Sequence, residues 1–153
     1  MLAVHTCPEP PLAGQKTLSV AGRAWNGPWT LDDDLSLEAW DATLVESARG
    51  KRRFLSGVGT SDAHDPEQTV GLPHTVVHAE DLGQVALVEG IRLGRSWLAE
   101  SAGVSLELIV ENGGRRAGLG ERLSVRDDAS VNITAAVGGA PETCVRILTD
   151  QGR

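Results

Sequence analysis

The spacing of apolar residues changes near residue 101, and this change constrains the fold more than any other feature of the sequence. Before it, apolar residues recur at the intervals of one helix face, at Leu37, Trp40, Leu44 and Ala48. After it, Val104 to Val110 alternate apolar and polar residues, which is the period of a half-buried strand. The sequence therefore predicts an α/β region over residues 1–101 and an all-β region over residues 102–153.

Short apolar runs in the first region alternate with helical patterns. A proline-rich loop at Cys7–Gln15 and a sharp turn at Asn26–Pro28 are expected before the first helix. Strands that alternate with helices are typical of parallel sheets. The apolar runs predict strands over residues 2–5, 18–25, 54–59 and 76–77.

Two helices are expected, and the sequence marks both ends of each. The first begins at the acidic run Asp32–Asp34, where carboxylates suit unpaired N–H groups, and it ends at Gly50. The second begins at Glu80–Asp81 and ends at Gly94. We expect this helix to turn four apolar residues inward, namely Leu82, Val85, Ala86 and Ile91.

The second region predicts antiparallel strands joined by tight turns. Asn112-Gly113 is a favoured hairpin turn. Alternation returns at Val131–Val137, and Thr143–Ile147 begins another strand. So few strands predict a small, incomplete antiparallel β-sandwich-like region with an exposed edge, and uncovered edges favour self-association.

Charge and hydropathy narrow the classes of partner. The chain has 153 residues, a formal charge of −7 and only 14 Lys and Arg, so nucleic acid is not expected as a partner. No apolar run approaches the roughly 20 residues of a membrane-spanning helix. The N-terminus has no basic segment typical of a signal peptide, so we expect a cytoplasmic protein without membrane contact. Cys7 and Cys144 are expected to be reduced packing residues.

Asp62 and His64 are the residues best placed for chemistry. They follow an apolar strand at its C-terminal end, where α/β folds build their active sites. Residues two apart in an extended backbone share one face, and a carboxylate with an imidazole suits Zn, Mn or Fe. The alternative is a polar turn whose Asp caps backbone N–H groups, and the spacing alone favours that alternative.

His74 and His78 are expected not to share an ion. Pro73 and the β-branched residues between the two histidines predict a strand. At roughly 3.3 Å per residue, the two rings would stand about 13 Å apart.

Three stretches of sequence, taken in order, resemble one family. They read Gly-Thr-Ser-Asp-Ala-His over Gly59–His64, Gly-Leu-Pro-His-Thr-Val-Val over Gly71–Val77, and Ile-Arg-Leu-Gly-Arg-Ser-Trp over Ile91–Trp97. This order resembles the C-terminal half of PHP-superfamily domains in the CehA/McbA-like branch. Trp25–Trp29 followed by Trp40-Asp41 also resembles that branch, and the likeness covers about residues 20–110.

The resemblance implies a partial, distorted β/α barrel of the PHP type over residues 1–101. It also implies that Asp62 and His64 are metal ligands. His5 lies near the position of the family's upstream His-Pro motif and is a third candidate ligand, although Thr6 follows it. In the family, two or three divalent metals generate hydroxide that attacks a phosphoester or a related bond.

The family also begins with a His-x-His pair, and this chain has no such pair. Its histidines stand only at positions 5, 64, 74 and 78. The resemblance therefore implies part of a metal-dependent phosphoesterase that does not turn over alone and whose divalent-metal site can stay empty. Two functions remain open. The first is this hydrolase part, which acts on a small-molecule substrate once it is completed. The second is a non-catalytic remnant or small binding protein that uses its β-rich tail.

Overall fold

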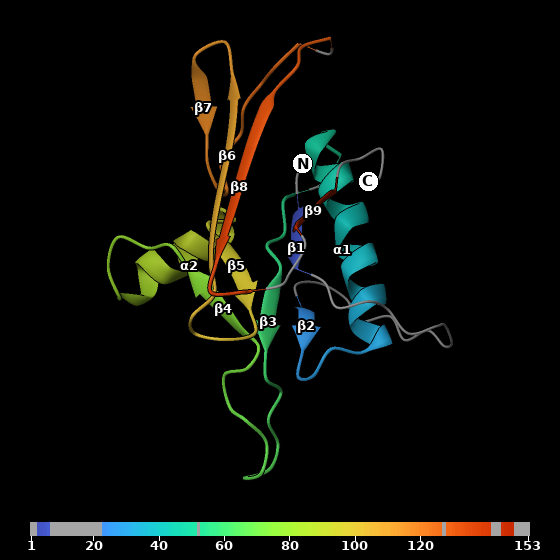
Figure 1. Cartoon of the computed structure of the whole chain (residues 1–153), viewed down its shortest axis with the longest axis vertical. Helices are drawn as coiled ribbons and strands as arrows, with labels where there is room; N and C mark the ends of the chain where they lie inside the picture. The colour runs from blue at the N-terminus through green and yellow to red at the C-terminus, as the bar shows by residue number, and fades with distance from the viewer. Residues whose placement is uncertain (1–2, 7–22, 52, 127, 142–144, 149–153) are drawn as a thin grey trace.

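Two helices and nine short strands make up the described part of the chain, as the computed structural model in Figure 1 shows. The structure describes residues 3–6, 23–51, 53–126, 128–141 and 145–148. Their strands form four small open sheets, three with two strands and one with three. The chain is therefore a mixed α/β structure with open sheets. The expected loop at Cys7–Gln15 lies outside the described residues, as do both cysteines.

A parallel strand pair joined by a helix begins the fold. β2 (Arg23–Asn26) and β3 (Val58–Thr60) pair in parallel, and α1 (Leu31–Ala48) connects them. The predicted strand over residues 54–59 is wrong at its start, because β3 begins only at Val58. The indole of Trp40, in α1, donates a hydrogen bond of 2.9 Å to the Leu55 carbonyl. The backbone of Leu55 is therefore bound to the helix, where a strand was predicted.

The acidic start of α1 is confirmed, and one carboxylate does most of the capping. Asp33 is only 5% exposed, and its carboxylate accepts hydrogen bonds from the backbone N–H and the hydroxyl of Thr30, at 2.7 and 2.8 Å. This is the reach-back half of a capping box. Leu44 is buried on the predicted apolar face, whereas Ala48 is exposed.

The next strand pair is antiparallel, which corrects the expectation of parallel pairing. β4 (His74–Val77) and β5 (Ser96–Ala99) run in opposite directions although α2 (Gln84–Arg92) lies between them. The chain turns at Gly94, which has a φ of +73°, and enters β5 at Ser96, three residues after the helix cap at Leu93. Residues 78–95 would be long enough for the crossover that parallel strands need, so the length of the connection does not set the direction of β5.

The inward face of α2 differs from the predicted one. Gly90 is buried, and a side chain there would meet Val77 and the His78 carbonyl at 2.6 and 2.9 Å. Ala86 and Ile91 are half-buried, as predicted, but Leu82 and Val85 are 91% and 80% exposed. The helix begins at Gln84, four residues later than predicted, because the Asp81 carboxylate accepts from the Gly83 N–H and shapes a turn first. Leu82 therefore lies outside the helix.

The β-rich region confirms the alternation in the sequence. β6 (Ser105–Asn112) lies between β7 (Arg115–Ala117) and β8 (Asn132–Gly138), and both pairs are antiparallel. The hairpin turn is centred one residue later than predicted, on Gly113-Gly114. Both residues have positive φ, +55° and +78°, as a two-residue type I′ turn requires.

The first and last strands of the chain pair with each other. β1 (Ala3–Thr6) is antiparallel to β9 (Val145–Leu148), with His5 opposite Arg146. The predicted final strand thus exists, but it joins the N-terminal end of the chain and not the sheet of β6 to β8. The division at residues 101 and 102 stays a prediction.

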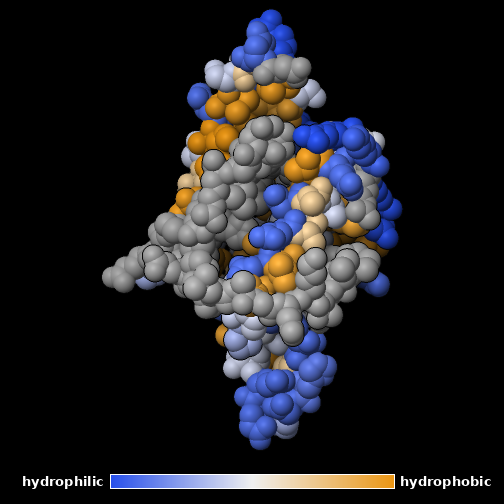
Figure 2. All heavy atoms as spheres, turned by 90° about the vertical axis from the view of Figure 1, so that its right-hand side faces the viewer, coloured by the Kyte–Doolittle hydropathy of each residue, from blue (hydrophilic) through white to orange (hydrophobic). Residues whose placement is uncertain are grey.

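The core of the described part is small. Its fully buried apolar side chains are Leu44, Ala99 and Ala117. Figure 2 shows hydrophobic residues at the surface of the upper part of the molecule, where Figure 1 places β6, β7 and β8. Neither of the two described helices has the length and apolar content needed to cross a bilayer.

Candidate metal-binding site at the carboxyl end of two parallel strands

The ends of β2 and β3 meet at one edge of their sheet. Because the strands are parallel, Asn26 and Thr60 close this edge together, paired in register. The Gly27 N–H donates to the Thr60 carbonyl at 3.0 Å and extends the contact beyond the strands. The residues after β3 therefore enter solvent at the sheet edge where α/β folds build their sites.

Asp62 and His64 meet at this edge. The His64 Nε2 lies 3.3 Å from the Asp62 Oδ1. The contact was predicted from an extended backbone, and that reason is wrong: Asp62 has a φ of +48°. The left-handed backbone of Asp62 turns the chain back, so that His64 approaches Asp62. Asp tolerates this conformation better than most residues do. Positive φ at a non-glycine residue costs about 1–3 kcal/mol and clusters at functional sites.

Asn26 holds the other oxygen of the same carboxylate. Its Nδ2 donates a hydrogen bond of 2.8 Å to the Asp62 Oδ2. The Asn26 backbone N–H is in turn bound by the Asp33 Oδ1 at 2.9 Å. The helix cap therefore positions Asn26, and Asn26 positions the Asp62 carboxylate.

Sequence reasoning missed Asn26 as a site residue and interpreted it only as part of a turn. The available signal was its place as the last residue of an apolar strand whose parallel partner ends near Asp62. That signal becomes usable only when the pairing of the strands is known.

Two tryptophans pack on the turn that follows Asn26. The rings of Trp25 and Trp29 meet edge to face with centroids 5.1 Å apart. The Trp25 indole donates to the Gly27 carbonyl at 3.0 Å, and the Trp29 indole donates to Asp34 at 3.2 Å. The pair stabilises the turn beside the site.

The Asp62–His64 pair is accessible from solvent, with side chains 36% and 77% exposed. Two ligands bound at about 2.1 Å to a tetrahedral zinc ion stand about 3.4 Å apart. The observed separation of 3.3 Å therefore fits two neighbouring ligands of one ion. Within the described ranges, no group of three or more His, Cys, Asp or Glu side chains is placed to hold a metal.

The other histidines belong to other elements of the fold. His74 begins β4, and its Nδ1 lies 2.9 Å from the Gly71 carbonyl. His78 follows β4, and its backbone N–H donates to the Arg95 carbonyl. His5 lies on β1 opposite Arg146, and its role as a ligand stays a prediction.

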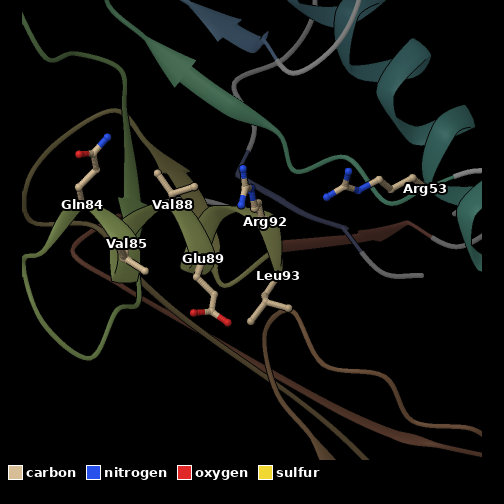
Figure 3. A pocket seen from close by; sticks show the side chains of 7 residues that line it. All are labelled: Arg53, Gln84, Val85, Val88, Glu89, Arg92 and Leu93. Carbon is tan, nitrogen blue, oxygen red and sulfur yellow. The ribbon is translucent and has the colours of Figure 1, made fainter.

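A surface depression lies along α2 and does not include Asp62 or His64. Its volume is about 750 Å³. Figure 3 shows the guanidinium of Arg53 pointing toward α2, with Arg92 on the helix side. The lining is mixed, with exposed Val85 and Val88 beside the charged Glu89. A shallow, mixed surface of this kind lacks the convergent polar groups of a formed active site.

No family model, curated protein or solved structure matches the chain. The relationship to PHP domains therefore stays a resemblance of motifs.

Proposed function

We propose that this chain is part of a PHP-type metal-dependent hydrolase and contributes Asp62 and His64 to its metal site. The observation that carries the proposal is the 3.3 Å approach of these two side chains at the carboxyl end of a parallel strand pair. A carboxylate and an imidazole at this separation suit one divalent ion.

The residues of this chain divide the work at the proposed site. Asp62 and His64 hold the ion, and Asn26 fixes the carboxylate by its 2.8 Å hydrogen bond. Such outer partners orient metal ligands and raise affinity. A bound ion would supply a water of lowered pKa for attack on a phosphoester or a related bond.

The proposal also assigns the surrounding strands to a larger architecture. The Thr75 hydroxyl donates to the Gly59 carbonyl at 3.0 Å and accepts from the Gly59 N–H at 2.9 Å, which links β3 to β4. We propose that the linked strand pairs form part of a distorted β/α barrel and that β6 to β8 form part of an antiparallel sandwich. Additional ligands come from outside this chain, since it has no His-x-His.

Equilibrium dialysis against Mn²⁺ or Zn²⁺, followed by elemental analysis, tests the proposal. We expect weak binding of one ion per chain at saturation, and well under one ion per chain in purified protein. Asp62→Asn should abolish binding, because Asn tolerates the left-handed backbone but lacks the charge. Asp65→Asn is the matched control, because Asp65 is an exposed neighbouring carboxylate. Equal binding by Asp62→Asn and the unmodified chain would contradict the proposal.

Phosphodiesterase assays with added Mn²⁺ or Zn²⁺ extend the test. We expect negligible turnover, because a cluster able to activate water needs more ligands than Asp62 and His64. Two or more tightly held metals, or turnover abolished by Asp62→Ala, would show instead that copies of this chain complete the site.

A second candidate function is a non-catalytic binding role for the β-rich tail. The observation that favours it is the position of β6, β7 and the upper part of β8, which extend beyond the body of the molecule (Figure 1). This function predicts no dependence on Asp62, so the dialysis experiment separates the two candidates.

A further inference from the structure

The two edges of the sheet formed by β6, β7 and β8 are protected unequally. β7 closes one edge with only three residues, and two of them, Arg115 and Arg116, are charged and exposed. Short, charged edge strands resist the addition of another strand. β8 closes the opposite edge with seven residues, Asn-Ile-Thr-Ala-Ala-Val-Gly, and has neither charge nor proline.

The outer edge of β8 is unpaired within the described residues. β8 pairs with β6 along its whole length, from Asn132 opposite Glu111 to Gly138 opposite Ser105. Among the described strands it has no second neighbour. A row of backbone N–H and C=O groups on a long, uncharged edge is a template for another strand.

The side chains of β8 divide cleanly between two faces. Ile133, Ala135 and Val137 are half-buried on the face that carries Leu106 and other apolar residues of β6. Asn132, Thr134 and Ala136 are exposed on the opposite face. Figure 2 shows hydrophobic atoms gathered just below the polar tip of this sheet.

We propose that β8 pairs with β8 of a second copy of this chain, antiparallel and centred on Ala135. This register places Ile133 opposite Val137 and Thr134 opposite Ala136. Apolar residues then lie opposite apolar residues on one face. A shift by one residue would instead place every apolar side chain opposite a residue of the exposed face. The pairing joins two three-stranded sheets into one.

The partner is a second copy because the strand is complementary to itself. Both members of each cross-strand pair come from the same face, and the strand brings no like charges together. A two-fold contact of this kind uses the same surface on both chains, so the assembly closes at the dimer. The inference deepens the second candidate function by naming the partner, and it does not depend on metal at Asp62 and His64.

Sedimentation velocity on two matched double variants tests the pairing. Thr134→Lys with Ala136→Lys sets lysine opposite lysine twice across the two-fold axis, and it should raise the dimer Kd about tenfold. Thr134→Glu with Ala136→Lys sets opposite charges together in the same positions and should keep the dimer. Both variants carry lysine in place of Ala136, opposite Glu107 of β6. The effect of this lysine within one chain is therefore the same in both variants. Circular dichroism of each variant reports folding.

A cysteine cross-link tests the register without charged substitutions. In a background with Cys7 and Cys144 replaced by serine, Ala135→Cys places two cysteines opposite each other with their Cα atoms about 4.5–5.5 Å apart, a separation that a disulfide can bridge. Ile133→Cys is the control on the same face, because the register sets it opposite Val137. We expect a disulfide-linked dimer for Ala135→Cys and none for Ile133→Cys.

Four results would overturn the inference. The first is a monomer of the unmodified chain at every concentration, and the second is a mass that grows beyond the dimer. The third is equal behaviour within either matched pair of variants. Loss of the dimer in Leu82→Lys, which alters the exposed residue before α2, would assign the contact to another surface.

Discussion

The corner formed by α1, β2 and β3 and the sheet formed by β6, β7 and β8 are stabilised in different ways. In the corner, β3 has three residues, and side chains supply many of the hydrogen bonds that hold the pieces together. In the sheet, an eight-residue strand and a seven-residue strand share a continuous backbone ladder.

This difference determines which substitutions each region tolerates. The corner depends on particular polar atoms, because a lost partner leaves a buried N–H or carboxylate unpaired. The sheet depends on alternation of side chains, which many residues satisfy. The candidate site lies in the corner, where polar groups already have fixed positions.

The largest effect is expected at Asp33, the residue on which the corner depends most. Asp33→Ala removes the acceptor for the backbone N–H groups of Asn26 and Thr30 and for the Thr30 hydroxyl. We expect a loss of about 2–4 kcal/mol in the free energy of unfolding, from the lost cap and the unpaired N–H groups. Urea denaturation measures it. Asp32→Ala, at an exposed position in the same turn, should change stability by less than about 1 kcal/mol. Equal losses in both variants would contradict the central role of Asp33.

The same substitution, made at Thr75 of β4, which binds β3 of the corner, and at Thr134 of the sheet, compares the two regions. Thr75→Val removes the hydroxyl that links β3 to β4 and leaves the N–H of Gly59, a buried residue, unpaired. The expected loss is about 1–3 kcal/mol. Thr134→Val, on the exposed face of β8, should change stability by no more than about 0.5 kcal/mol. The comparison fails if thermal unfolding shows the larger loss for Thr134→Val.

The smallest effect is expected at the hairpin turn of the sheet. Gly113→Asn keeps a residue that accepts positive φ and should change stability by less than about 0.5 kcal/mol. Gly113→Val forces a β-branched residue into the same conformation and should cost about 1–2 kcal/mol. Urea midpoints of the two variants give the difference. Equal midpoints would mean that the turn conformation does not limit the hairpin.

The elements with strong local patterns were predictable. The acidic first turn of α1, the strand at Val76-Val77 and the alternation of β6 and β8 all appear as expected. In the corner, the predicted neighbourhood of Asp62 and His64 is confirmed, although its cause is not the extended backbone that was expected. The exposed side chain of Leu82 was not predictable, since its periodicity does not reveal that the helix begins at Gln84. The exposure of Val85 was not predictable either, since the helix packs on β4 through Gly90.

The sequence by itself determined the approximate positions of α1, α2, β6, β8 and the hairpin turn, because capping, turn chemistry and periodicity act between near neighbours in the chain. The tertiary structure decided which distant segments meet. It pairs β1 with β9, turns β5 antiparallel to β4, and brings Asn26 to within 2.8 Å of Asp62. These contacts join residues far apart in the chain, and local preferences do not determine them, because several pairings of short strands satisfy the same pattern.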